Sequence, residues 1–155
     1  MKKEIQSLVN HIEETFGGQP WFGRAAFELL DEIDPSIVHI KPGNKEHSLS
    51  ELLYHMITWM TFTEKRILGE KDDMKAFEKL DWREMDASAQ NWTDGLGELK
   101  RIKDRIISLL KEKEDSFLDE KVDFREYNFR FLITGMIEHS IYHLGQIAYV
   151  KKLLS

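Results

Sequence analysis

Two histidines stand four residues apart near the C-terminus, in the stretch IEHSIYHLGQIAYVKKLL, residues 137–154. In a helix of about 3.6 residues per turn, His139 and His143 share one face, so both imidazoles can reach one point beside it. The other residues of that face are apolar: Leu132, Met136, Ile147, Val150 and Leu154. Buried imidazoles need partners. Either each histidine is a core residue with a hydrogen bond, or the pair binds a metal ion.

A third metal ligand should come from another helix, and the best candidate is His55 in ELLYHMITWM. It lies at the edge of an apolar helix face, near Trp59 and Phe62, which either wall a cleft or belong to the core. Periodicity permits this position for a ligand but does not require it. The remaining histidines are interpreted as ordinary surface or loop residues: His11, His39 and His47.

Three neutral imidazoles suit a borderline divalent ion, with Zn²⁺ or Ni²⁺ as the first candidates. Three protein ligands leave a position open for water or substrate, which is the pattern of catalytic sites. Such an ion can lower the pKa of water or bind a thiolate. The chain contains no cysteine, so any thiol would have to be a separate small molecule.

Two further polar residues are candidate catalytic groups. Glu51 precedes His55 by one turn and could act as a general base. However, Ser48 and Glu51 also form an S-x-x-E capping box, which already accounts for the glutamate and is the favoured interpretation. Gln146 follows His143 by about one turn and either hydrogen-bonds the site or is a polar residue at a helix interface.

The periodicity is helical almost throughout and strand signals are poor, which predicts an all-α chain forming a single domain over 1–155. GGQPWFG, residues 17–23, interrupts the first helical region, leaving one kinked helix or two short ones, with Pro20 able to open the second. The expected helical regions are about 3–32, 48–69, 90–113 and 128–154, with a short helix near 72–80. Four amphipathic helices of this kind predict a four-helix bundle.

Composition excludes several function classes. The formal net charge of −6 gives no reason to expect binding to nucleic acid or to an anionic membrane. No apolar run approaches the length of a membrane span, and the N-terminus does not look like a signal peptide, so a cytoplasmic location is expected. Phosphate loops, dinucleotide-binding fingerprints and serine nucleophile elbows are absent from the sequence.

The pairing of LSELLYHMITW with EHSIYHLGQIAYVKKLL resembles the DinB-like superfamily, which includes YfiT-type metal-dependent hydrolases and bacillithiol-type transferases. The most specific part is H-x-x-x-H-x-G-Q-I. The resemblance covers the whole chain and implies an up-down-down-up four-helix bundle, often a homodimer. It also implies a divalent metal held by His55, His139 and His143.

Two functions follow from the resemblance. The first is an enzyme whose metal activates water for hydrolysis or a low-molecular-weight thiol for transfer to a small-molecule substrate. The second is a non-catalytic, dimeric metal- or ligand-binding stress-response protein of the same fold. Under a third hypothesis the histidines are structural and bind no metal. Exposed Phe16, Trp21 and Phe22 could form a dimer interface or belong to the core.

Overall fold

The computed structural model describes residues 2–71 and 73–155, and every regular element in this part of the chain is helical. The helices are α1 (Lys3–Gly17), α2 (Ala26–Asp31), α3 (Leu49–Ile67), α4 (Met74–Asp81), α5 (Trp92–Lys111) and α6 (Phe129–Leu154), with a 3-10 helix at Asp115–Asp119. The all-α prediction is therefore confirmed.

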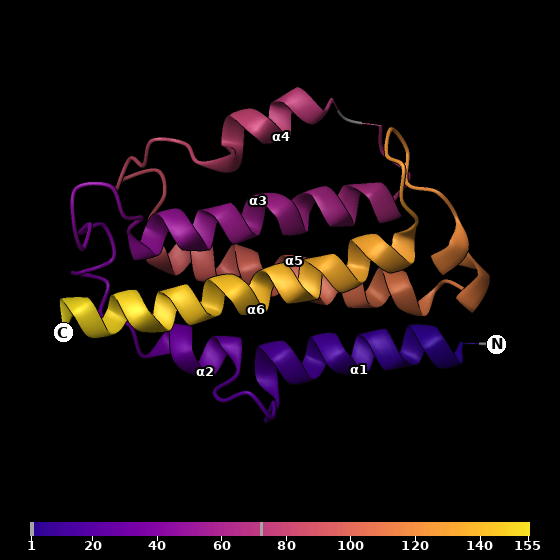
Figure 1. Ribbon diagram of the computed structural model, residues 1–155, viewed down its shortest axis with the longest axis horizontal. Coiled ribbons are helices and arrows are strands. Elements are labelled where there is room, and N and C mark those ends of the chain that lie inside the picture. Colours follow the sequence, from indigo (N-terminus) through magenta and orange to yellow (C-terminus); the bar gives the residue numbers. More distant parts are fainter. Residues whose placement is uncertain (1, 72) are drawn as a thin grey trace.

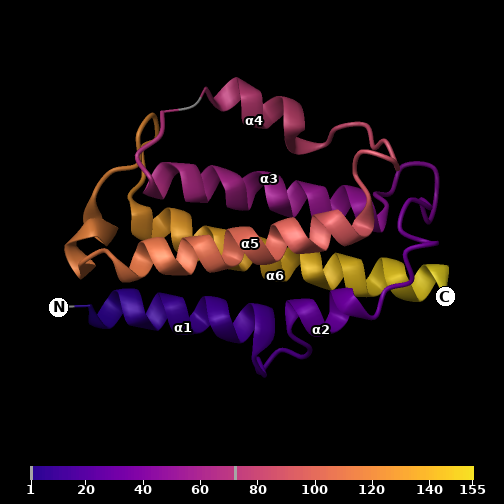
Figure 2. The same ribbon diagram turned by 180° about the vertical axis from the view of Figure 1, so that it is seen from behind.

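The long helices α1, α3, α5 and α6 form an up-down-down-up bundle (Figures 1 and 2). Helices α1 and α6 run in one direction, and α3 and α5 run in the other. Both α1 and α3 pack against α5 and α6, so α1 and α3 lie at opposite corners. Because α3 and α5 are parallel, a long crossover must join them, and that crossover carries α4 back along the outside of α3.

Local sequence explains where the helices begin. Ser48 and Glu51 form the predicted capping box: the Ser48 hydroxyl accepts from the Glu51 N–H at 3.1 Å, and the Glu51 carboxylate accepts from the Ser48 N–H at 2.7 Å. Asn91 and Asn128 cap α5 and α6 with a single bond each, because their side-chain oxygens accept from the N–H groups of Asp94 and Phe131. These caps fix the residue at which each helix begins, and hence the position of each histidine along its helix.

The first helical region is two helices and not one kinked helix. Helix α1 ends at Gly17, as the glycine pair predicts, but α2 begins at Ala26 and not at Pro20. Phe16 lies in the core, whereas Trp21 is fully exposed and Phe22 is 46% exposed. Of the three aromatic residues considered for a dimer interface, only Trp21 and Phe22 are therefore exposed enough to form one.

The apolar face predicted for α6 is correct. Leu132, Met136, His143, Ile147 and Val150 are buried, and His139 is half-buried. Because α3 packs directly against α6, the buried face of α3 meets the histidines of α6. Within the described residues, no helix has the length and hydropathy needed to cross a membrane.

Candidate metal centre

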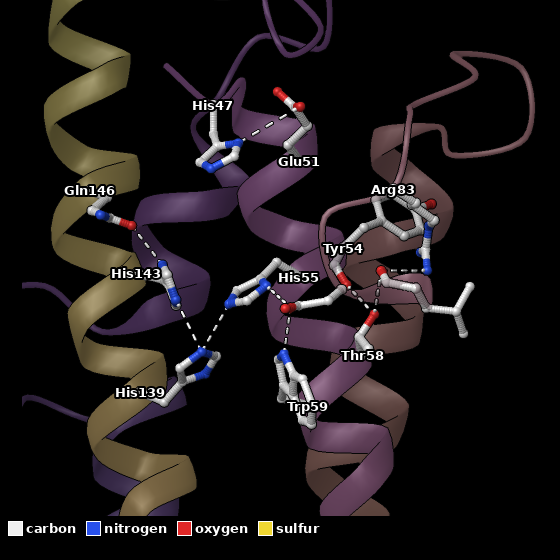
Figure 3. A network of polar contacts seen from close by, with 12 residues as sticks. His47, Glu51, Tyr54, His55, Thr58, Trp59, Arg83, His139, His143 and Gln146 are labelled. Atoms are coloured by element: carbon white, nitrogen blue, oxygen red, sulfur yellow. Dashed lines mark hydrogen bonds and ion pairs between the residues drawn. The ribbon is translucent and has the colours of Figure 1, made fainter. Parts of the chain in front are cut away.

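The three predicted ligands meet between α3 and α6. The Nε2 atom of His139 lies 2.9 Å from Nε2 of His55 and 3.0 Å from Nε2 of His143. His55 and His143 are each 5% exposed, and the three rings converge on one point (Figure 3). Two nitrogens bound to one ion at about 2.0–2.1 Å are about 2.9–3.4 Å apart for bond angles between about 90° and 109°. The spacing of the histidines therefore fits a shared ion.

Neighbouring acceptors indicate which nitrogen carries the proton in two of the rings, His143 and His55. His143 Nδ1 donates to Gln146 Oε1 at 2.6 Å, which leaves a lone pair on His143 Nε2. His55 Nδ1 lies 2.6 Å from Asp81 Oδ1. This second contact is short but lacks hydrogen-bond alignment, so the carboxylate acts on the ring through its charge. That charge favours the proton on His55 Nδ1 and the lone pair on Nε2.

The resulting arrangement cannot be satisfied by hydrogen bonds among the histidines alone. The Nε2 atom of a neutral imidazole has either one N–H or one lone pair in the ring plane. Two lone pairs, from His55 and His143, face the single Nε2 of His139. His139 can donate to one of them at most, and the other contact then brings two nitrogen lone pairs together. A cation at the point of convergence would satisfy all three rings, so the residues present fit a metal.

Burial keeps these imidazoles in the neutral form that binds metal. Burial, followed by the charges of His143 and His55, lowers the pKa of His139 to about 4. Burial also lowers the pKa of His55, where the charge of Asp81 works in the opposite direction. The pKa of His143 is lowered by burial despite its hydrogen bond to Gln146. At neutral pH all three nitrogens are therefore available as ligands.

The structure adds three residues that sequence reasoning missed. Asp81 at the end of α4 contacts His55 and also accepts a hydrogen bond from Trp59 Nε1 at 2.6 Å. The Trp82 ring stacks on His55 with 3.8 Å between ring centroids, and on His47 with 3.7 Å. His47 is therefore not the ordinary loop residue expected, because it forms the outer layer of a stack that covers His55. No spacing pattern links residues 47 and 81–82 to the histidines.

The two candidate catalytic residues lie in different environments. Gln146 contacts His143 directly, as expected under the interpretation that it hydrogen-bonds the site. The Glu51 carboxylate instead contacts Ser48, the Lys41 ammonium at 3.3 Å and His47 at 3.8 Å. Burial raises the pKa of Glu51, but the Ser48 N–H and Lys41 outweigh it, so the pKa lies below its ordinary value. Such a carboxylate is a weak base, and catalytic roles for both residues stay predictions.

Comparison with known proteins shows the family of the chain. Searches of the curated proteins and of the solved structures found no match. The family model of the DinB superfamily matches residues 22–147, which include all three histidines, Asp81, Trp82 and Gln146. The resemblance drawn from the two histidine-bearing stretches is thereby confirmed, and the chain belongs to the DinB superfamily.

Proposed function

We propose that the protein is a metal-dependent enzyme that holds one divalent ion, Zn²⁺ or Ni²⁺, with His55, His139 and His143. The observation that carries the proposal is the convergence of three neutral imidazoles whose Nε2 atoms cannot all be satisfied by one another. An ion with three protein ligands keeps an open position and acts as a Lewis acid toward water or a thiol.

The surrounding residues orient the ligands. Gln146 accepts a hydrogen bond from the Nδ1–H of His143 and so holds that ring. The negative charge of the Asp81 carboxylate orients the ring of His55. Partners of this kind fix the tautomer and increase the basicity of the ligand nitrogen. Trp82 covers one face of His55, which restricts the directions from which a substrate can approach.

A thiol is better supported than water as the activated nucleophile. Hydrolysis calls for a base beside the ion, and the only carboxylate foreseen for that role, Glu51, is held in a helix cap with a lowered pKa. A thiol has an ordinary pKa of about 8.5, against about 15.7 for water, so it needs far less help to ionise. We therefore favour transfer of a small thiol to an electrophilic substrate, with hydrolysis as the second reaction.

The test begins with metal content, measured by plasma mass spectrometry on protein purified without a histidine tag. We expect near-stoichiometric metal in the wild type and its loss in the double variant His139→Ala/His143→Ala. His11→Ala removes a histidine from an exposed face of α1 and should retain the metal. A metal-free wild type that takes up neither Zn²⁺ nor Ni²⁺ would refute the proposal.

Activity then separates the enzyme from a non-catalytic binding protein. Conjugation of a small thiol, such as cysteine, to 1-chloro-2,4-dinitrobenzene should be faster with the loaded wild type than with the double variant. A loaded protein that accelerates neither this reaction nor ester hydrolysis would favour a dimeric metal- or ligand-binding stress-response protein.

We also propose that the chain forms a homodimer. The exposed pair of Trp21 and Phe22 supports an interface near the start of α2. Light scattering coupled to size exclusion measures the mass, and a monomer at micromolar concentration would contradict the proposal.

A further inference from the structure

A pocket of about 280 Å³ opens between α3 and α6 beside the candidate metal centre. His139 lies in its wall, so the pocket and the metal centre share a residue. Half of the other lining residues are aromatic: Trp59, Phe62, Tyr127 and Phe131. Gly135 and Met136 of α6 complete the side nearest His139, and the glycine leaves room where any other residue would place a side chain.

Two polar groups of this pocket, on Trp59 and Thr63, are already paired within the protein. Trp59 Nε1 donates to Asp81, and the Thr63 hydroxyl donates to the Trp59 carbonyl at 3.0 Å. The lining residues, all within the described chain, include no lysine, arginine, aspartate or glutamate. A charged group entering the pocket would lose its water without gaining an ion pair, whereas a flat apolar group would meet aromatic rings.

The pocket lies on the side of the metal centre that Trp82 does not cover. In Figure 3, His139 and Trp59 lie at one end of the histidine cluster, and His47 and Gln146 lie at the other. The stack of His47 on Trp82 on His55 belongs to the far end. A molecule seated against Trp59 would therefore be adjacent to His139 without displacing that stack.

We propose that this pocket binds an uncharged, flat apolar group with one or two fused rings, and that this group is the apolar part of the substrate. A dry cavity of about 150 Å³ is enough for benzene, so 280 Å³ leaves space for a second ring. The term substrate rests on the proposed function, since it is the metal centre beside His139 that would act on the reacting group. The binding site itself does not depend on the metal.

The test uses 2-naphthol as an uncharged probe and naphthalene-2-sulfonate as a charged probe with the same rings. Binding to the full chain is measured by isothermal titration calorimetry and by ligand-observed NMR. Gly135→Leu adds a side chain at the wall of the pocket, where a Cβ meets no atom within 4 Å. Gly135→Met repeats the test with an unbranched side chain. Gly97→Leu on α5, where a Cβ is equally unobstructed, is the matched control.

We expect 2-naphthol to bind the wild type and Gly97→Leu alike, and to bind both Gly135 variants at least about tenfold more weakly, since the new side chain fills the space. Naphthalene-2-sulfonate should bind at least about tenfold more weakly than 2-naphthol to wild type treated with chelator, in which no ion attracts the sulfonate. No binding of 2-naphthol to the wild type, equal binding to the Gly135 variants, or equal binding of the two probes would each overturn the proposal.

Metal content in the same samples separates this proposal from the proposed function. Gly135→Leu should keep the metal content of the wild type, because it changes none of the three histidines. A wild type without metal that still distinguishes the probes as expected would refute the metal-dependent enzyme and leave the aromatic site in place. A metal-loaded wild type that does not bind 2-naphthol would refute the aromatic site and leave the proposed metal centre in place.

Discussion

One carboxylate oxygen of Asp81 lies 2.6 Å from both Nδ1 of His55 and Nε1 of Trp59. It thus connects His55, a proposed metal ligand, to the wall of the aromatic pocket. Removing its charge should weaken metal binding by about 10- to 100-fold, the effect usual for a residue that orients a ligand histidine. We expect this loss in Asp81→Asn, measured by competition with a chelator of known affinity.

Asp104→Asn is the matched control, because Asp104 is an exposed carboxylate on α5 paired with Lys103. It should leave metal affinity unchanged. An Asp81→Asn protein that binds metal as tightly as the wild type would show that the contact with His55 has no role in holding the ion. Cobalt-loaded protein provides a second measurement, because its visible spectrum reports any change in ligand geometry.

The lowered pKa of His139 makes the metal-free protein sensitive to acid. In the unfolded chain this histidine takes up a proton near its ordinary pKa of 6.5, whereas the folded protein resists it down to about 4. Between these values the unfolded state binds more protons, so the free energy of unfolding falls as the pH falls through this window. Urea denaturation of chelator-treated protein should show lower stability at about pH 5 than at about pH 7.

Other groups also titrate in this range, so the decisive quantity is a difference between variants. His139→Leu should lose less stability than the wild type between the two pH values, because it has no proton to take up at this site. His11→Leu on the exposed face of α1 should follow the wild type. If His139→Leu and the wild type lose stability in parallel, the burial of His139 has no consequence for acid stability.

The histidines differ in how far the sequence alone could place them. His139 and His143 lie on one helix face because of local periodicity, and periodicity sufficed to predict that they meet. His55 needed the family resemblance, since its position at the edge of the α3 face allowed several orientations. Asp81, Trp82 and His47 could not be predicted, because they come from the end of α4 and from the loop before α3, whose positions depend on packing rather than on spacing.

At the scale of the helices, the cap of α3 sets the position of His55. Ser48→Ala removes the hydroxyl that accepts from the Glu51 N–H and should cost about 1 kcal/mol of stability. Glu51→Gln keeps an oxygen that can accept from Ser48, because glutamine also serves in capping boxes. We therefore expect Glu51→Gln to cost less than Ser48→Ala in urea denaturation, and to retain turnover with any substrate found.

The control for the serine is Ser108→Ala, which changes an exposed position within α5 and should be neutral or slightly stabilising. The outcome that would contradict this account is a Glu51→Gln protein with normal stability and metal content but little turnover. Glu51 would then be a general base, and the cap would not explain its presence.

The elements themselves were largely predictable, but the position of α4 in the bundle was not. The short helix expected near residues 72–80 exists as α4, Met74–Asp81. The pattern of one amphipathic face indicated a helix but not where that face would pack. Its position outside α3 follows from the parallel direction of α3 and α5, which requires a connection running the length of the bundle. Only the assembled bundle therefore explains why α4 delivers Asp81 and Trp82 to His55.

At the scale of the whole molecule, the histidines join helices that are distant in sequence. His55 and His139 are 84 residues apart, and their contact links α3 to α6 across the bundle. An ion bound there would hold the two helices together and would have no comparable site in the unfolded chain. Binding energy would therefore appear as folding stability.

This linkage predicts how the melting temperature responds to metal. Free metal at about 100 times its dissociation constant adds about 2.7 kcal/mol of stability, which for a domain of this size corresponds to about 5–10 °C. Chelator should lower the melting temperature of the wild type by this amount, and added Zn²⁺ or Ni²⁺ should restore it. His143→Leu should melt at one temperature with or without metal, because two histidines remain and the third ligand is replaced by an apolar side chain. Equal shifts in both proteins would mean that the ion stabilises the fold from another site, whereas a shift confined to the wild type would identify the contact between α3 and α6 as the place where metal binding and folding are coupled.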